Sequence, residues 1–399
     1  MSSLPGGGSP PSRPAGGAAV AADDSPTRHS GARLIPGPRL RRAGPALPWH
    51  PPARRLVRRT AFLHGTAVSS ALAALALAGC GVLILQLVHR QTGTVGLLVG
   101  MGLALLPLPF VLGALAWLNQ TGRVPLRHTL FCLAWGACAA TTVAIMANGW
   151  ASDFLIAHQG SARGETLGAE FATPLIEETA KGAALLLLLL PVRRRLRCRT
   201  VRTRAALARR SPAPLRRSAR RLLRAPRASY LHPRSRARRN PRTLAAGVVL
   251  GGVTACGFAF TENALYLGRA FTDDQQARLD GIGLGETPSL RDFDSTVHTF
   301  VLRGLLSPFA HPLFTALTGL GLAVALTTGR RWLARTAGPA GLLLSMALHG
   351  VWNAAAGLGT HGFLLVYAAL MVPCFAALVC FAAWARARTA RHAGRSRTA

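Results

Sequence analysis

The feature that most constrains this chain is a series of about eight long apolar stretches that contain almost no charged residues. A helix needs about 20 such residues to cross the hydrocarbon core of a bilayer, where every backbone hydrogen bond must close within the segment. The chain is 50% hydrophobic, yet its formal net charge is +33, a combination foreign to soluble domains. We therefore predict an all-α fold, a polytopic membrane helix bundle of about eight transmembrane helices. The predicted spans cover residues 66–88, 95–117, 129–147, 168–191, 243–268, 304–328, 336–356 and 361–384.

The arginines lie in every second connection between these spans, and this alternation predicts the orientation. Residues 1–59 contain ten arginines, and residues 192–242 contain twenty with no aspartate or glutamate. The intervening connections at 148–167 and 269–300 are acidic instead. Because basic loops stay on the cytoplasmic side, we predict a multi-pass protein of the cell membrane with both termini in the cytoplasm.

The composition also predicts the division of the chain. We expect a disordered basic cytoplasmic arm over 1–60, a membrane domain over 61–385 and a basic cytoplasmic tail over 386–399. The arm has no continuous apolar core, so we expect no cleavable signal peptide there. The arginine-rich loop over 192–242 has one aromatic residue, Tyr230, to stack on a base. We expect it to bind anionic lipid headgroups and not nucleic acid.

A few ionisable or amide side chains lie inside the predicted spans, where lipid should exclude them. A charged group at mid-membrane costs roughly 2.5 to 3.5 kcal/mol, so such groups normally face each other or water and mark a functional path. They occur in four consecutive spans, from the fourth to the seventh. They are Glu177, Glu178, Lys181, Glu262, Asn263, His311, His349 and Asn353.

The depths of these groups agree with one another. The fourth and sixth spans run inward and the fifth and seventh run outward in the predicted topology. At 1.5 Å per residue, the acids and histidines then all lie roughly 9 to 14 Å below the extracytoplasmic surface. We therefore expect them to converge on one site near that face.

Local spacing suggests how the groups interact. Glu177 and Glu178 lie four and three residues before Lys181, so one ammonium can reach either carboxylate. Neighbouring helical residues diverge by about 100°, so one glutamate should face the cavity while the other pairs elsewhere. Around His311, the segment SPFAHPLF has prolines on both sides, which predicts a broken helix and a wet site.

The segment HGVWN places His349 and Asn353 on one helical face. The amide could orient the imidazole, or both groups could donate to an oxyanion. A single buried asparagine, such as Asn263 or Asn353 taken alone, is more typical of packing between helices.

Three carboxylates against one lysine leave negative charge that a shared proton, a protonated histidine or a cation must balance. One interpretation is a glutamate that takes a proton from water while His and Asn stabilise the oxyanion. In a metal variant, two histidines and a glutamate hold a zinc ion and another glutamate is the base. The candidate metal ligands are Glu178, Glu262, His311 and His349.

Two other functions use the same features. A proton- or cation-coupled transporter could use the cluster as a relay. A non-catalytic scaffold could bind membrane partners through the arginine-rich loop.

Four motifs in this order, EETAK, FAFTEN, SPFAHPLFTALTG and HGVWN, resemble the PrsW family of intramembrane proteases. The motif layout is also similar to that of the membrane-embedded CAAX prenyl endopeptidases. The resemblance covers roughly residues 61–385, apart from the arginine-rich loop. That loop and the long basic arm depart from the family pattern, so regulation and partners can differ.

The resemblance implies regulated intramembrane proteolysis, with cleavage of a membrane protein such as an anti-sigma factor near its extracytoplasmic side. It implies catalytic roles for Glu177, Glu178, Glu262, His311 and His349, with Lys181, Asn263 and Asn353 in support. Whether the chemistry is metallo- or glutamic-type stays open at this point.

Overall fold

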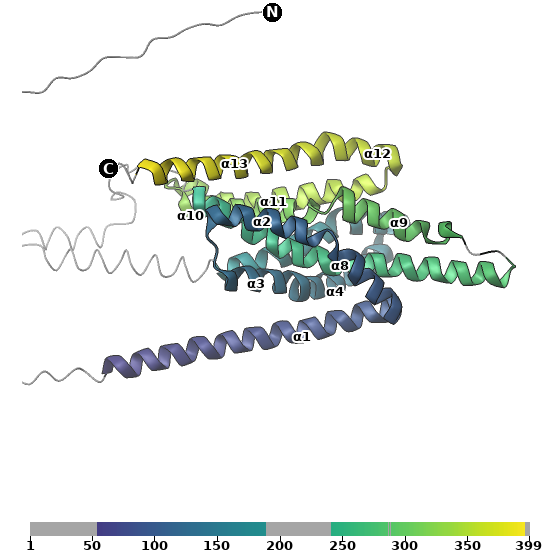
Figure 1. Cartoon of the computed structure of the whole chain (residues 1–399), viewed down its shortest axis with the longest axis horizontal. Coiled ribbons are helices and arrows are strands. Elements are labelled where there is room, and N and C mark those ends of the chain that lie inside the picture. Colours follow the sequence, from purple (N-terminus) through teal and green to yellow (C-terminus); the bar gives the residue numbers. More distant parts are fainter. Residues whose placement is uncertain (1–53, 189–240, 286, 288, 396–399) are drawn as a thin grey trace, which may run out of the picture. The chain divides into compact units, whose positions relative to one another are not determined.

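The structure is a computed structural model that describes residues 54–188, 241–285, 287 and 289–395. By contacts the chain divides into Met1–Ala61 and Phe62–Ala399, and the core and the site both lie in the second unit. The predicted arm over 1–60 and arginine-rich loop over 192–242 fall almost wholly outside the described residues. Every regular element within the described ranges is helical (Figure 1).

The first half of the described chain runs from α1 to the helix that carries the EETAK motif. That last helix, over residues 173–188, carries no label in Figure 1. The labelled elements are α1 (Arg54–Leu105), α2 (Leu108–Gly122), α3 (Leu126–Ala134), the π-helical turn η1 (Trp135–Ala140), α4 (Thr141–Gln159), α5 (Ser161–Leu167) and the π-helical turn η2 (Gly168–Ala172).

The second half begins with the long helix α8, which has 43 residues. Its elements are α8 (Pro241–Gly283), η3 (Leu290–Phe293), α9 (Asp294–Phe300), the π-helical turn η4 (Val301–Leu306), α10 (Ala310–Thr327), α11 (Arg331–Ala356), α12 (Gly359–Val366), the π-helical turn η5 (Tyr367–Met371) and α13 (Val372–Arg395).

The long helix α1 is two helices joined at Gly93. This residue has φ 67° and ψ −180°, a conformation that glycine adopts without a steric cost. The chain therefore reverses within α1, and its second part continues through Pro107 into α2 (Figure 1). One apolar stretch, Ser70–Gly122, accordingly covers two of the predicted spans.

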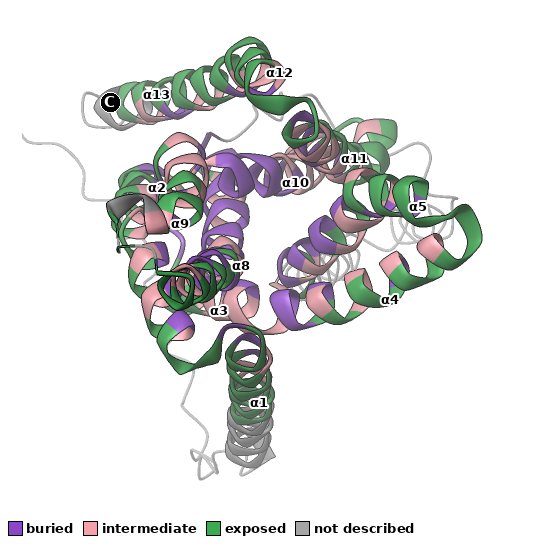
Figure 2. Cartoon of the chain, turned by 90° about the vertical axis from the view of Figure 1, so that its right-hand side faces the viewer, coloured by how far each residue is buried: buried purple, intermediate pink, exposed green. Residues whose placement is uncertain are grey.

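Helix α8 forms the centre of the bundle. In the most apolar stretch of α8, 78% of the residues are buried. In the first and last candidate membrane spans, the buried share of the corresponding stretch is 11%, so those two lie at the periphery. The buried residues in Figure 2 are concentrated on α8 and α10. These two helices touch through small residues: a Cβ at Gly251 would collide with the carbonyl oxygen of Thr315. Close contact between small residues is the usual way in which membrane helices pack.

The number of membrane crossings is only partly established. Five stretches of the described chain are long and apolar enough to cross a membrane. The helix over 173–188 is not among them, because its described part is short and carries Glu177, Glu178 and Lys181. All eight predicted ranges are mainly helical where they are described, with breaks at 106–107 and 307–309, but the count of eight spans stays a prediction.

The acidic segment over 269–300 is mostly helix and not the open connection that the sequence suggested. Helix α8 continues to Gly283, since no glycine or proline interrupts residues 269–280. Asp274 Oδ2 accepts hydrogen bonds from the backbone N (2.7 Å) and Oγ1 (2.6 Å) of Thr296, in the first turn of α9. A carboxylate from α8 thus caps α9 and fastens the extension to the bundle.

Candidate active site

The helix over 173–188 supplies three charged side chains on adjoining turns. Lys181 Nζ lies 2.9 Å from Glu178 Oε1 and 3.2 Å from Glu177 Oε2, so the ammonium binds both carboxylates at once. It also lies 3.8 Å from the centre of the Phe258 ring. Lys181 and Glu178 are fully buried and Glu177 is 4% exposed, so these three charges lie in the interior of the bundle.

Glu178 faces α10 and α11. Its Oε2 accepts hydrogen bonds from Thr315 Oγ1 (2.8 Å) and Ser345 Oγ (2.6 Å). Its Oε1 lies 3.2 Å from Nδ1 of His349. Both oxygens are therefore occupied by protein groups, and Glu178 holds the imidazole of His349 in a fixed orientation.

Glu177 points the other way. Its Oε1 accepts a hydrogen bond from Asn148 Nδ2 on α4 (3.2 Å), and its Oε2 lies 3.9 Å from Nε2 of His349. Both acids therefore share Lys181 and His349, but their further partners differ: Asn148 for Glu177, and Thr315 and Ser345 for Glu178.

The two histidines come from different helices and meet edge to face. Their ring centres are 5.2 Å apart with the planes at 90°. His311 Nδ1 lies 3.2 Å from Lys181 Nζ, and its Nε2 lies 2.8 Å from Glu262 Oε2 on α8. Phe314 stacks on His349 with ring centres 5.0 Å apart and shields one side of the pair.

His311 is placed by the break that the prolines predict. The π-helical turn η4 ends at Leu306, and α10 starts at Ala310. His311 is therefore in the first turn of α10, where the chain has just changed course. The predicted helix break is confirmed, and it turns the imidazole towards Glu262 and Lys181.

The two predicted supporting asparagines lie at the edge of this cluster. Asn263 Oδ1 accepts a hydrogen bond from Arg303 (3.0 Å). Asn353 Nδ2 donates to the backbone oxygen of Ala169 in η2 (2.9 Å), so it bonds backbone and not the imidazole of His349. Both contacts hold neighbouring segments in place.

Four site residues had no place in the sequence interpretation. Asn148 sits one residue beyond the third predicted span, and Arg303 one residue before the sixth, so both were assigned to connections. Ser345 and Thr315 each lie four residues from a site histidine, a spacing that could have indicated them. Arg303 lies 3.6 Å from Glu262 Oε1 and 3.7 Å from the Tyr266 ring centre, and adds a second cation.

One set of side chains has the arrangement of a metal centre. Ligand atoms of Glu177, His311 and His349 lie within 4.8 Å of one another. Two imidazoles and a carboxylate are a donor set that suits zinc. Glu262 Oε2 is buried and lies 2.8 Å from Nε2 of His311, so a fourth ionisable group adjoins this set. The contact of Glu178 with His349 Nδ1 matches the carboxylate–histidine pairs that orient metal ligands. The residues present therefore fit a divalent metal.

The chain matches the model of a known protein family. The model of a family described as PrsW family intramembrane metalloprotease matches residues 124–378, well over half of the chain. No curated protein and no solved structure matches significantly. The matched range includes every residue of the cluster just described.

Proposed function

Since the chain belongs to the PrsW family of intramembrane metalloproteases, and is thus a hydrolase of membrane proteins in the bilayer, we propose its site and its mode of cleavage. The chain cuts a membrane-protein substrate near the extracytoplasmic side, in the manner of a protease that acts on an anti-sigma factor. The observation that carries this proposal is the convergence of Glu177, His311 and His349 from three helices.

The proposed metal ligands are Glu177, His311 and His349. Glu177 is preferred to Glu178 because its carboxylate, and not that of Glu178, belongs to the set whose ligand atoms lie within 4.8 Å of one another. A divalent metal such as zinc, bound there, would supply a Lewis acid that polarises a carbonyl and activates water. Glu178 contacts His349, and Lys181 contacts Glu177 and His311, so these two residues hold the three ligands in position.

Glu262 is the proposed general base. Its Oε2 lies 2.8 Å from Nε2 of His311, so the imidazole holds the carboxylate in place to take a proton from water. The water oxygen bonds to the carbonyl carbon of the scissile peptide, and the proton passes to the departing amine as the C–N bond breaks. Arg303 pairs with Glu262 Oε1, and Asn263 accepts a hydrogen bond from Arg303 and so holds that guanidinium in place.

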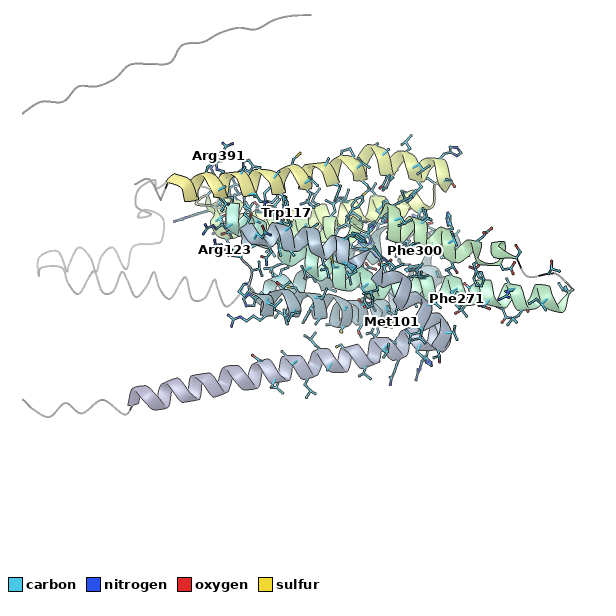
Figure 3. All side chains as sticks on the ribbon, in the orientation of Figure 1. Met101, Trp117, Arg123, Phe271, Phe300 and Arg391 are labelled. Carbon is cyan, nitrogen blue, oxygen red and sulfur yellow. The ribbon has the colours of Figure 1, made fainter. Side chains whose placement is uncertain are left out.

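The distribution of charge supports the extracytoplasmic placement. Figure 3 shows Trp117, Arg123 and Arg391 at one end of the second unit and Phe271, in the acidic segment, at the other. Arg386 on α13 donates to the backbone oxygen of Trp117 (2.9 Å), so basic residues of two distant segments gather at that end. With that end in the cytoplasm, the protein lies in the cell membrane with both termini inside.

The test compares two acids of the same helix. Glu262→Gln should lower cleavage roughly 100-fold or more, because general-base catalysis is lost. Asp273→Asn, an exposed acid further along α8, should leave it unchanged. The measurement is the appearance of new protein termini in membranes of cells that express each variant. Glu178→Gln and His349→Ala should insert normally and also lose cleavage.

Full cleavage by the Glu262→Gln variant would remove the proposed base. Ion flux into liposomes that disappears with Glu262→Gln, without any proteolysis, would instead support a transporter. Deletion of residues 196–238 addresses the scaffold alternative: a protease keeps its cleavage without the loop.

A further inference from the structure

An apolar groove of about 480 Å³ runs along the outside of the helix that carries Glu177. One wall consists of η1 and α4, with Val143 and Ala147, and the other consists of residues 173–188, with Ile176 and Thr179. The wall residues Val143 and Leu175 are 52% and 56% exposed, so the groove is open along the outer surface of the bundle.

Two hydrogen bonds join the walls. Trp135 Nε1 donates to the backbone oxygen of Ala180 (2.9 Å), where Trp135 and Ala180 line the groove. Asn148 Nδ2 donates to Glu177 (3.2 Å) at the position that directly follows Ala147 and Ile176 on the two walls. Asn148 and Glu177 do not line the groove, but each directly follows a residue that does, so the bond between them lies next to the groove.

Asn148 has one polar atom without a partner. Its Oδ1 is buried and accepts no hydrogen bond, while its Nδ2 is used by Glu177. An unpaired buried carbonyl oxygen is uncommon and calls for an explanation. Asn148 Oδ1 is thus an unpaired hydrogen-bond acceptor next to the groove, and an N–H group of a bound molecule could satisfy it.

The chemistry of the groove and of Asn148 together identify the occupant. The groove is lined almost entirely by hydrocarbon, so what binds it is apolar, either a lipid chain or a membrane segment of a protein. A lipid chain has no donor for Asn148 Oδ1. A peptide that leaves helical form for cleavage exposes backbone N–H groups, which find no water partner in lipid.

We propose that this groove receives the apolar membrane segment of the substrate and that Asn148 Oδ1 binds a backbone N–H of that segment as it passes to Glu177. The inference rests on the proposed function, because it names the entry route to the same site. Asn148 acts here as a positioning residue that holds both the substrate and Glu177.

The groove can be tested with a synthetic probe in nanodiscs that contain the full chain. The probe is a transmembrane Leu/Ala peptide of about 20 residues with a central diazirine. Photocrosslinks should map to residues 139–147 and 175–183. Val143→Trp and Ala183→Phe, on opposite walls, should each lower the yield about tenfold, as the loss of a modest contact energy predicts. Met146→Trp, on the same helix but outside the groove, should not. Equal yields in all three variants would overturn the proposed groove.

Asn148 is tested with a second probe that differs by a central Gly–Pro pair, which opens the backbone. This probe should crosslink next to Glu177 more than the uniform peptide does. In Asn148→Leu the two probes should give equal yields there, while Gly149→Ala, which has open space at its Cβ, should behave as the native chain. A persistent difference between the probes in Asn148→Leu would remove the proposed role.

These outcomes separate the inference from the proposed function. Crosslinks in the groove without any cleavage by the native chain would leave the docking surface standing and reject the protease site. Cleavage that is lost with Glu262→Gln but unaffected by Val143→Trp and Asn148→Leu would support the protease site and reject the docking groove. Labelling of the groove by a photoreactive lipid, with none by either peptide, would assign it to lipid and overturn the inference.

Discussion

Lys181 is the only lysine in the chain, and its ammonium joins the two neighbouring carboxylates to Nδ1 of His311. Its three N–H donors can each meet an acceptor in the dry interior, which suits a compact point charge better than a planar guanidinium. The site therefore depends on a lysine in a chain whose other basic residues are arginine.

Lys181→Met tests this dependence. The variant leaves Glu177 and Glu178 buried without their cation, so it should lower the free energy of unfolding by about 3 to 5 kcal/mol. Lys181→Arg should recover only part of that loss, because the larger guanidinium cannot reproduce the three contacts. Unfolding in mixed micelles, followed by circular dichroism, measures both. A stability equal to that of the native chain in Lys181→Met would contradict the account.

A second prediction at this scale compares two threonines of α10. Thr315 Oγ1 donates to Glu178, whereas Thr318 Oγ1 is buried and unpaired. Thr315→Val should cost about 1 to 3 kcal/mol, because the carboxylate loses a donor. Thr318→Val, of the same shape, should be neutral or stabilising. If the same unfolding assay gave equal costs for both, the hydrogen bond to Glu178 would have no energetic weight.

At the scale of the elements, the sequence predicted the helices but not how far they extend. The apolar stretches and the proline break before His311 follow from local chemistry, and both are seen. The length of α8 was missed because a membrane-span criterion stops at the first charged residues, whereas Asp274 is held by Thr296 of another helix. Asn148 and Arg303 were missed for a similar reason, since their partners Glu177 and Glu262 are distant in sequence.

The contact between α8 and α10 gives a prediction about glycine. These helices carry Glu262 and His311, so their spacing sets the distance between the two groups. Gly251→Ala should force the helices apart, cost about 1 to 3 kcal/mol of stability, and lower cleavage. Gly113→Ala on α2 has open space at its Cβ and should be slightly stabilising, by about 0.5 to 1 kcal/mol. A Gly251→Ala variant as stable and active as the native chain would show that this close contact is dispensable.

At the scale of the whole molecule, we predict that the acidic extension of α8 and the basic residues that follow α2 and end α13 lie on opposite sides of the membrane. We predict that Leu284→Cys, in a cysteine-free background, reacts with an impermeant maleimide added to intact cells, because Leu284 is 83% exposed. A cysteine at Arg123 should react only after the membrane is opened. The reverse labelling pattern would invert the topology and move the site towards the cytoplasm.

The central claim is that Glu177, His311 and His349 form one hydrolytic centre, and bound metal tests it without knowledge of the substrate. The measurement is the metal content of the purified full chain by mass spectrometry, for the native protein, His349→Ala and the control Thr318→Val. The account predicts about one divalent metal per chain in the native protein and the control, and loss of most of it in His349→Ala. A native chain without metal, or a His349→Ala variant that retains the native amount, would contradict it.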